Sequence, residues 1–269
     1  MQEMRRFERD GTQLSYEDFG GSGAPLLLLH GLAGYAGEWR RSAELLAARY
    51  RVFGLDQRGH GSSERFPNDV SREAYTDDAA AMIQKLGLGP VVLVGQSMGA
   101  STAMLLAARY PELVSELVVI EGTPDGPESP DPNPAAAVQI GESLSCWPVP
   151  FADQAVAREF FESKGFDPET WTAGLEVRDG RLWPRFDIDT MIACIADLQS
   201  RSYWTQWSSI RCPTLLIFGE HGMFDLEHRQ HAAHELPGCE LVTIPNAAHD
   251  VHLDAPEAWV QALIESSTS

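Results

Sequence analysis

Short apolar runs that recur between helical segments constrain the fold of this chain more than any other feature of its sequence. Six such runs, each four or five residues long, are Pro25–Leu29, Val52–Leu55, Val91–Val94, Leu117–Ile120, Leu215–Phe218 and Leu241–Ile244. Runs that lack a regular polar alternation are typical of strands buried on both faces, as in a parallel sheet. We therefore expect these runs to form the centre of a mostly parallel sheet.

Helical patterns lie between the apolar runs. They are Glu38–Arg49, Ser71–Leu86 with Ser71 as the N-cap, Ala100–Arg109, Leu226–Leu236 and Pro256–Glu265. Strands that alternate with helices predict a doubly wound α/β sheet covered by helices on both faces. The N-terminal stretch Arg5–Phe19 is broken by Asp10-Gly11 and predicts a β-hairpin, so we expect about eight strands.

The region 123–209 breaks the alternation. It starts with a Pro- and Asp-rich segment, Thr123–Pro134, and continues with helical, aromatic-rich sequence. Five of the seven tryptophans lie here: Trp147, Trp171, Trp183, Trp204 and Trp207. We expect a helical cap inserted into a core made of residues 1–122 and 210–269. The tryptophans either bind substrate, with Trp147, Trp183 and Trp204 as candidates, or only fasten the cap to the core.

Composition and charge narrow the classes of partner. Hydrophobic residues make up 43% and charged residues 22%, which is typical of a soluble globular protein. The formal charge of −19 argues against binding to nucleic acid or to an anionic membrane, because both depend on Lys and Arg. The apolar runs are too short to cross a bilayer. The polar start Met1–Arg6 has no apolar signal region, so we expect a cytoplasmic protein that is a monomer or a homodimer.

The four cysteines do not indicate a metal or redox site. Cys146, Cys194, Cys212 and Cys239 are widely spaced and form no CxxC pair. We therefore expect reduced structural thiols, no metal and no organic cofactor.

The segment Val91–Ala100 carries the strongest chemical signal. A buried strand leads into Gly95-Gln96-Ser97-Met98-Gly99, a Gly-x-Ser-x-Gly motif that opens a helix. The turn is so tight that both glycines must lack a Cβ atom, and the serine hydroxyl is held exposed in strained geometry. This context predicts that Ser97 is a catalytic nucleophile.

Two further segments complete the predicted site. The HG loop, residues 29–34, follows an apolar strand, and we expect the amides of Leu32 and Met98 to stabilise an oxyanion. After the last strand, His249 is the expected general base, because Ser…His in this chain order suits such a nucleophile. His252 is a competitor for that role, whereas His30 and His60 are expected to stabilise their loops.

Together these segments resemble the α/β-hydrolase superfamily over essentially the full length of the chain. The matching pieces are HGLAG, DQRGHGSS, GQSMG, CPTLLIFGEHG and NAAHDVHLDAPE. The resemblance implies a serine nucleophile at Ser97, a base at His249 and an oxyanion hole that includes Leu32. A Ser at this turn, in place of Asp, argues against epoxide hydrolases and haloalkane dehalogenases of the same fold.

The sequence departs from the resembled family at the third member of its catalytic triad. Most members have an Asp in a GExD-like loop, but here Gly222 occupies that position. Glu121, at the end of a buried strand, is the favoured substitute, since a buried carboxylate needs a partner; fungal zearalenone lactonases resemble this arrangement. Asp225 is the alternative. A third interpretation is that Glu121 only caps a turn before Pro124 and the enzyme works with a weakened dyad.

The expected function is hydrolysis of a small-molecule carboxylic ester or lactone through an acyl-enzyme on Ser97. The aromatic cap favours a bulky apolar or aromatic substrate. The same residues also allow cleavage of a C–C bond in a ring-fission diketone, thioester hydrolysis or a cofactor-free perhydrolase activity. A non-catalytic ligand sensor is the alternative outside the enzymes, and the missing Asp at Gly222 is the feature that favours it.

Overall fold

A single mixed sheet of eight strands forms the centre of the computed structural model, which describes residues 4–127, 131 and 134–267. Part of the predicted Pro- and Asp-rich segment lies outside these residues. The strands are β1 (Arg5–Arg9), β2 (Thr12–Gly21), β3 (Ala24–Leu29), β4 (Tyr50–Asp56), β5 (Val91–Gln96), β6 (Val114–Ile120), β9 (Thr214–Gly219) and β10 (Glu240–Ile244). Their order is β1-β2-β4-β3-β5-β6-β9-β10, and all pairings beyond β2–β4 are parallel. The predicted α/β fold with a mostly parallel sheet is confirmed.

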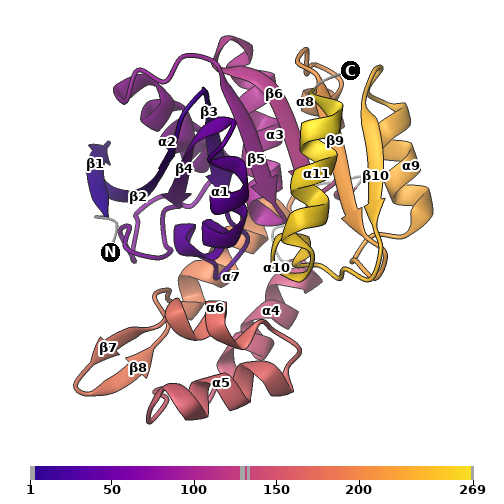
Figure 1. Ribbon diagram of the computed structural model, residues 1–269. Coiled ribbons are helices and arrows are strands. Elements are labelled where there is room, and N and C mark those ends of the chain that lie inside the picture. The colour runs from indigo at the N-terminus through magenta and orange to yellow at the C-terminus, as the bar shows by residue number, and fades with distance from the viewer. Residues whose placement is uncertain (1–3, 128–130, 132–133, 268–269) are drawn as a thin grey trace.

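Helices cover both faces of this sheet (Figure 1). They are the short helix η1 (Ala36–Trp39), α1 (Arg40–Leu46), α2 (Arg72–Lys85), α3 (Met98–Arg109), the short helix η2 (Pro111–Leu113), α9 (Leu226–His234), α10 (Val251–Asp254) and α11 (Pro256–Ser266). The predicted N-cap Ser71 accepts a hydrogen bond from the amide of Ala74 at 3.3 Å. The segment predicted as one helix from Glu38 is divided between η1 and α1, and α3 begins at Met98, directly after Ser97.

The run Leu26–Leu29 shows why the central strands are continuously apolar. All four side chains are fully buried. Leu27 and Leu29 belong to the core beneath α2 and α3, whereas Leu26 and Leu28 belong to the core beneath α1 and α11. Successive strand residues point to opposite faces, and here both faces are covered, so neither tolerates a polar alternation.

The cap lies between β6 and β9 and extends away from the sheet (Figure 1). Its elements are α4 (Ala135–Ser145), α5 (Gln154–Ser163), α6 (Pro168–Ala173), β7 (Glu176–Arg178), β8 (Arg181–Trp183) and α7 (Ile188–Leu198). The name cap refers to these elements and the segments that connect them. The cap has its own aromatic core around Trp147, Phe151 and Phe161.

The cap differs in two ways from the expected all-helical insertion over residues 123–209. It contains the β7–β8 hairpin, which turns at Asp179-Gly180 with positive φ at both residues, as a two-residue hairpin loop requires. The helix α8 (Trp204–Trp207) packs on the core, where the Trp207 indole donates to the carbonyl of Ala232 in α9 at 2.8 Å. Among the described helices, none is both long enough and apolar enough to cross a membrane.

Candidate active site

Ser97 occupies the strained turn that its motif predicts. It follows β5 with φ 53° and ψ −116°, a conformation that L-residues rarely adopt. A Cβ atom on Gly95 would lie 2.2 Å from the carbonyl oxygen of Gly99, and one on Gly99 would lie 2.3 Å from the carbonyl oxygen of Leu29. Both glycines are therefore required by close backbone approach.

The HG loop lies directly beside this turn. A Cβ atom on Gly31 would lie 3.4 Å from the Cβ of Ser97. Met98 is the first residue of α3, where backbone N–H groups have no partner inside the helix. Leu32 is half-buried at the cap side of the loop and packs against the cap's aromatic core. The roles of Leu32 and Met98 as oxyanion donors remain predictions.

His30 fixes the HG loop, as its sequence context predicts. Its Nε2 accepts a hydrogen bond from the backbone amide of Gln57 at 3.0 Å, and its Nδ1 then carries the proton and donates to the carbonyl of Gly31 at 2.7 Å. The Gln57 side chain in turn donates to the His30 carbonyl at 2.7 Å. With both ring nitrogens engaged in a fully buried site, His30 has no free nitrogen for a substrate.

Glu121 is the carboxylate that the described contacts bring to His249. Its Oε2 lies 3.2 Å from Nδ1 of His249. The Glu121 side chain is fully buried and also accepts hydrogen bonds from the backbone amides of Gly219 at 2.8 Å and Met223 at 2.9 Å. These three partners satisfy a carboxylate that would otherwise be costly to bury.

Gly222 makes room for this carboxylate. A Cβ atom at position 222 would lie 2.0 Å from Oε1 of Glu121 and 2.6 Å from its Oε2. A side chain at this position, including the Asp that is usual in the resembled family, cannot coexist with Glu121 in its observed place. The absence of a side chain at position 222 is therefore what allows the Glu121 carboxylate to occupy its observed place.

Asp225, the alternative acid, has a different local role. It is the N-cap of α9 and accepts hydrogen bonds from the backbone amide of His228 at 3.0 Å and from the His228 ring at 2.6 Å. These bonds lower the pKa of the Asp225 carboxyl from its usual value, and the bond from the backbone amide has the larger effect. Its side chain is 65% exposed, so the structure places Asp225 at a helix end in solvent.

Gln96 joins the histidine to the serine turn, a role that no local sequence pattern indicates. We call residues 245–250, between β10 and α10, the histidine loop. The Gln96 side chain donates to the carbonyl of His249 at 3.0 Å and approaches the Asp250 carboxylate at 3.5 Å. Because Gln96 immediately precedes Ser97, this bond places the backbone of His249 next to the strained turn.

His252, the competitor for the role of base, and His60 are both buried. His252 pairs through Nε2 with Oε1 of Glu38 at 3.0 Å and is 2% exposed. His60 is fully buried, with Nδ1 2.9 Å from the carbonyl of Arg58 and no described partner for Nε2. Burial, and then the neighbouring His30, lower the pKa of His60 well below its usual value, so this ring is neutral in the folded protein.

The buried neutral His60 predicts a loss of stability in acid. The unfolded chain takes up a proton at this residue below about pH 6.5, whereas the folded chain does not, so stability present above that pH is lost as the pH falls. The loss approaches ~1.4 kcal/mol per pH unit for one proton. Urea unfolding at pH 7.5, 6.0 and 5.0 should show a shallower pH dependence for His60→Gln than for the unmodified protein. Parallel curves for the two proteins would contradict the assignment.

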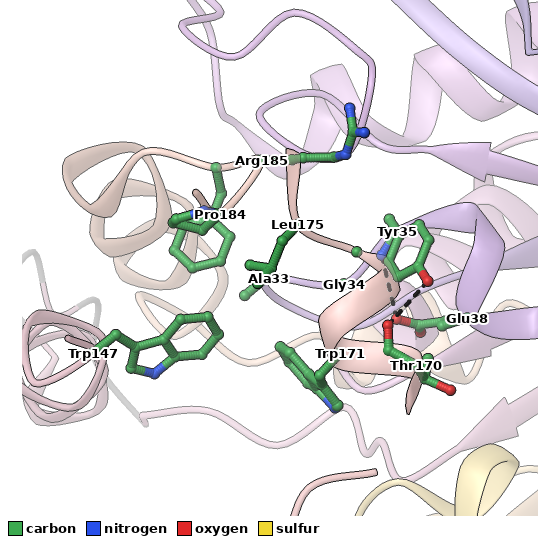
Figure 2. Close-up of a pocket in the computed structure, with 12 residues that line it drawn as sticks. Ala33, Gly34, Tyr35, Glu38, Trp147, Thr170, Trp171, Leu175, Pro184 and Arg185 are labelled. Carbon is green, nitrogen blue, oxygen red and sulfur yellow. Dashed lines mark hydrogen bonds between the residues drawn. The ribbon is translucent and has the colours of Figure 1, made fainter. Parts of the chain in front are cut away.

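An aromatic pocket opens between the HG loop and the cap (Figure 2). About 370 Å³ there is not filled by atoms, a volume that includes the part open to solvent. Ala33, Gly34 and Tyr35 form the core side, while Trp147, Trp171, Leu175 and Phe186 are among the cap residues that line it. The Tyr35 hydroxyl donates to the carbonyl of Thr170 in α6 at 3.0 Å, which ties the end of the HG loop to the cap.

Only one of the three tryptophans predicted to bind substrate lines this pocket. Trp147 does so, but Trp183 lies on β8 beneath the guanidinium of Arg178, 5.5 Å from the ring centre, and Trp204 packs against the ring of His231 at 4.4 Å. Trp183 and Trp204 do not line this pocket, because the hairpin and the core-packed α8 direct them elsewhere, and their role in substrate binding stays a prediction. Trp171 lines the pocket instead.

No metal site accompanies these residues: in the part of the chain that the structure describes, no group of three or more His, Cys, Asp or Glu side chains could hold an ion.

Comparison with known proteins identifies the family to which this chain belongs. The family model for the alpha/beta hydrolase fold matches residues 24–148. The chain is 32% identical over 248 residues to the sn-1-specific diacylglycerol lipase ABHD11 of Mus musculus, covering 88% of this chain and 79% of the relative. It is 28% identical over 244 residues to the (E)-2-((N-methylformamido)methylene)succinate hydrolase of Acinetobacter baylyi, covering 90% of each.

A solved structure gives the same picture of the fold. The crystal structure of E-2-(acetamidomethylene)succinate hydrolase superposes with a TM-score of 0.89 over the whole of both chains, at 23% identity. The two sequence relatives are hydrolases, and their matches extend over core and cap. This chain therefore belongs to the α/β-hydrolase fold family.

Proposed function

We propose that this protein is a serine hydrolase that cleaves a carboxylic ester or lactone of a bulky apolar or aromatic small molecule. The observation that carries the proposal is the buried Glu121 carboxylate on Nδ1 of His249, next to a strained Ser97. The carboxylate holds the tautomer with the proton on Nδ1, which leaves Nε2 free to act as a base.

The proposed reaction has two steps. The Ser97 hydroxyl attacks the substrate carbonyl carbon while His249 Nε2 takes its proton, and the resulting imidazolium is stabilised by Glu121. The amides of Leu32 and Met98 donate to the oxyanion, and His249 returns the proton to the departing alcohol. Water, deprotonated by His249, then attacks the acyl-enzyme, releases the acid and regenerates Ser97.

Labelling with a fluorophosphonate tests this proposal directly. We expect rapid addition of one phosphonyl group to the unmodified protein, followed by intact mass, and none to Ser97→Ala. Glu121→Ala should slow the labelling, and Asp225→Ala should not. An unmodified protein that resists labelling would contradict the proposal and favour a ligand sensor. The absence of an Asp at position 222 is a weak argument for a sensor, because Glu121 presents a carboxylate to His249.

The alternative reactions use the same residues and differ only in the bond that is cleaved. C–C hydrolysis of a ring-fission diketone and thioester hydrolysis both pass through attack at a carbonyl carbon. Parallel kcat/KM measurements on aryl esters, aliphatic lactones, acyl thioesters and a diketone rank them. We expect the ester and lactone substrates to be turned over fastest, and a diketone that exceeds them by tenfold or more would reassign the reaction.

The aromatic pocket predicts the substrate preference. We expect Trp147→Ala and Trp171→Ala to lower kcat/KM for a naphthyl ester by about 10–100-fold, because each truncation removes apolar contact worth roughly 1.5–3 kcal/mol. Activity on a small acetate ester should change less than threefold. Trp204→Ala, which removes a tryptophan stacked on His231 outside the pocket, is the matched control. Equal losses on both esters would refute the assignment of the pocket.

A further inference from the structure

A buried acid–histidine pair lies beside the proposed catalytic residues and is not part of their reaction. Oε1 of Glu38, on η1, lies 3.0 Å from Nε2 of His252, on α10. The two side chains are 7% and 1% exposed. They are separated by 214 positions in the sequence, so the pair connects two distant segments of the core.

One end of the pair holds the HG loop. The second carboxylate oxygen of Glu38 accepts a hydrogen bond from the backbone amide of Tyr35 at 3.2 Å. It also lies so close to Gly34 that a Cβ atom there would be 2.4 Å away. Glu38 thus fixes the backbone only two positions after Leu32, the predicted oxyanion donor.

The other end of the pair holds the segment that follows the histidine loop. The His252 ring packs on the Trp39 indole with centroids 4.2 Å apart, and Trp39 meets the edge of Trp259 at 5.9 Å. His252 lies three positions after His249, whose carbonyl accepts from Gln96. The backbone of His249 is therefore held by Gln96 and lies three positions before the packed ring of His252.

Stability alone does not account for such a pair. A buried polar pair is often matched or exceeded in stability by apolar residues of similar volume, because the cost of desolvation offsets the gain from the bond. The charged neighbourhood adds to this cost: the nearby Asp250 carboxyl has its pKa raised by burial, and Glu38 also contributes, after burial itself, to raising the pKa of the Tyr35 hydroxyl. What the pair supplies, and what apolar residues cannot, is a directional connection between two loops.

We infer that Glu38 and His252 are positioning residues that fix the distance between the HG loop and the histidine loop. This inference rests on the proposed function, since it assigns the pair an effect on the proposed oxyanion donor at Leu32 and on His249. Neither residue exchanges a proton with substrate; each acts through the backbone that it holds.

The test separates positioning from folding. With a small activated ester, Glu38→Ala and His252→Phe should lower kcat by about 10–100-fold with KM within threefold, because displacement of an oxyanion donor acts on the transition state. His252→Phe keeps the aromatic contact with Trp39 and removes only the bond to Glu38. Glu38→Gln should restore kcat to within about fivefold of the unmodified protein, because its amide still bonds both Tyr35 and His252.

Ser42→Ala is the matched control. The Ser42 hydroxyl accepts a buried hydrogen bond at 3.0 Å from the indole of Trp259, in the same layer of the core, but holds neither loop. It should lower Tm as much as His252→Phe does and leave kcat unchanged. Glu38→Ala and His252→Phe combined should lose no more activity than the worse single variant, because both remove the same connection.

The outcomes distinguish this inference from the function on which it rests. An unmodified protein that neither reacts with fluorophosphonate nor hydrolyses esters overturns both. An active protein whose His252→Phe variant keeps full kcat, or whose loss is matched by Ser42→Ala at equal Tm, overturns the positioning role alone. If Glu38→Ala does not fold, Glu38→Gln and His252→Phe decide the question, and equal losses in these two contradict the inference.

Discussion

Replacement of Glu121 by Gln is expected to reduce kcat by about 10³–10⁴-fold, the cost typical of neutralising a triad acid. Gln can donate to Nδ1 of His249 and thereby hold the wrong tautomer, and it carries no charge to stabilise the imidazolium. KM should change little, because the buried carboxylate lies behind the histidine. Initial rates on an aryl ester, with thermal unfolding as a check of folding, measure the effect.

Asp225→Asn is the matched control for Glu121→Gln. Asn caps a helix about as well as Asp, so we expect little change in stability and full turnover. The reverse pattern, with Asp225→Asn inactive and Glu121→Gln active, would assign the acid to Asp225.

The second large effect is expected at Gly222. Gly222→Ala introduces a Cβ atom 2.0 Å from Oε1 of Glu121, so the carboxylate must leave its place against His249. We expect kcat to fall by about 10²-fold or more, as for other displacements of a catalytic group by an ångström. Steady-state rates and fluorophosphonate labelling should fall together.

Gly238→Ala provides the control for Gly222→Ala. A Cβ atom at Gly238 meets nothing within 4 Å, but the residue has φ +82°, so the substitution costs stability without touching the site. Gly222→Asp should be as inactive as Gly222→Ala, whereas its combination with Glu121→Ala should recover part of the rate by placing an acid at the position usual in the family. A fully active Gly222→Ala would show that Glu121 does not need its observed position.

Local sequence patterns were sufficient for the sheet and for the strained turn at Ser97. The apolar runs predicted β3, β5, β6 and β9 because a strand that is buried on both faces is apolar at consecutive residues. Gly95 was informative for a similar reason, since the carbonyl that excludes its Cβ belongs to Gly99, four residues along the chain, whereas the Cβ of Gly99 is excluded by the distant carbonyl of Leu29. Glu121 was anticipated by a physical argument: a carboxylate at the end of a buried strand requires a partner.

Apart from Glu121 and His249, contacts between distant residues could not be predicted from the sequence. Gln96 meets His249 across 153 positions and Glu38 meets His252 across 214, and nothing local marks either pair. The sequence could not tell which tryptophans of residues 123–209 line the pocket for a related reason: all are aromatic and helix-compatible, and only the tertiary fold decides which face it. The β7–β8 hairpin did have a local signal, the Asp179-Gly180 dipeptide, which the aromatic-rich context obscured.

The end of β9 and the loop after it bind the Glu121 carboxylate through backbone amides, and this has a consequence for directed evolution. The loop contributes the amides of Gly219 and Met223, while the side chains of Met223 and His221 are 72% and 66% exposed. Because the side chains at positions 221 and 223 are exposed, we expect both positions to tolerate substitution. A saturation library at these two positions should retain a high proportion of active clones, provided that Gly222 is left unchanged.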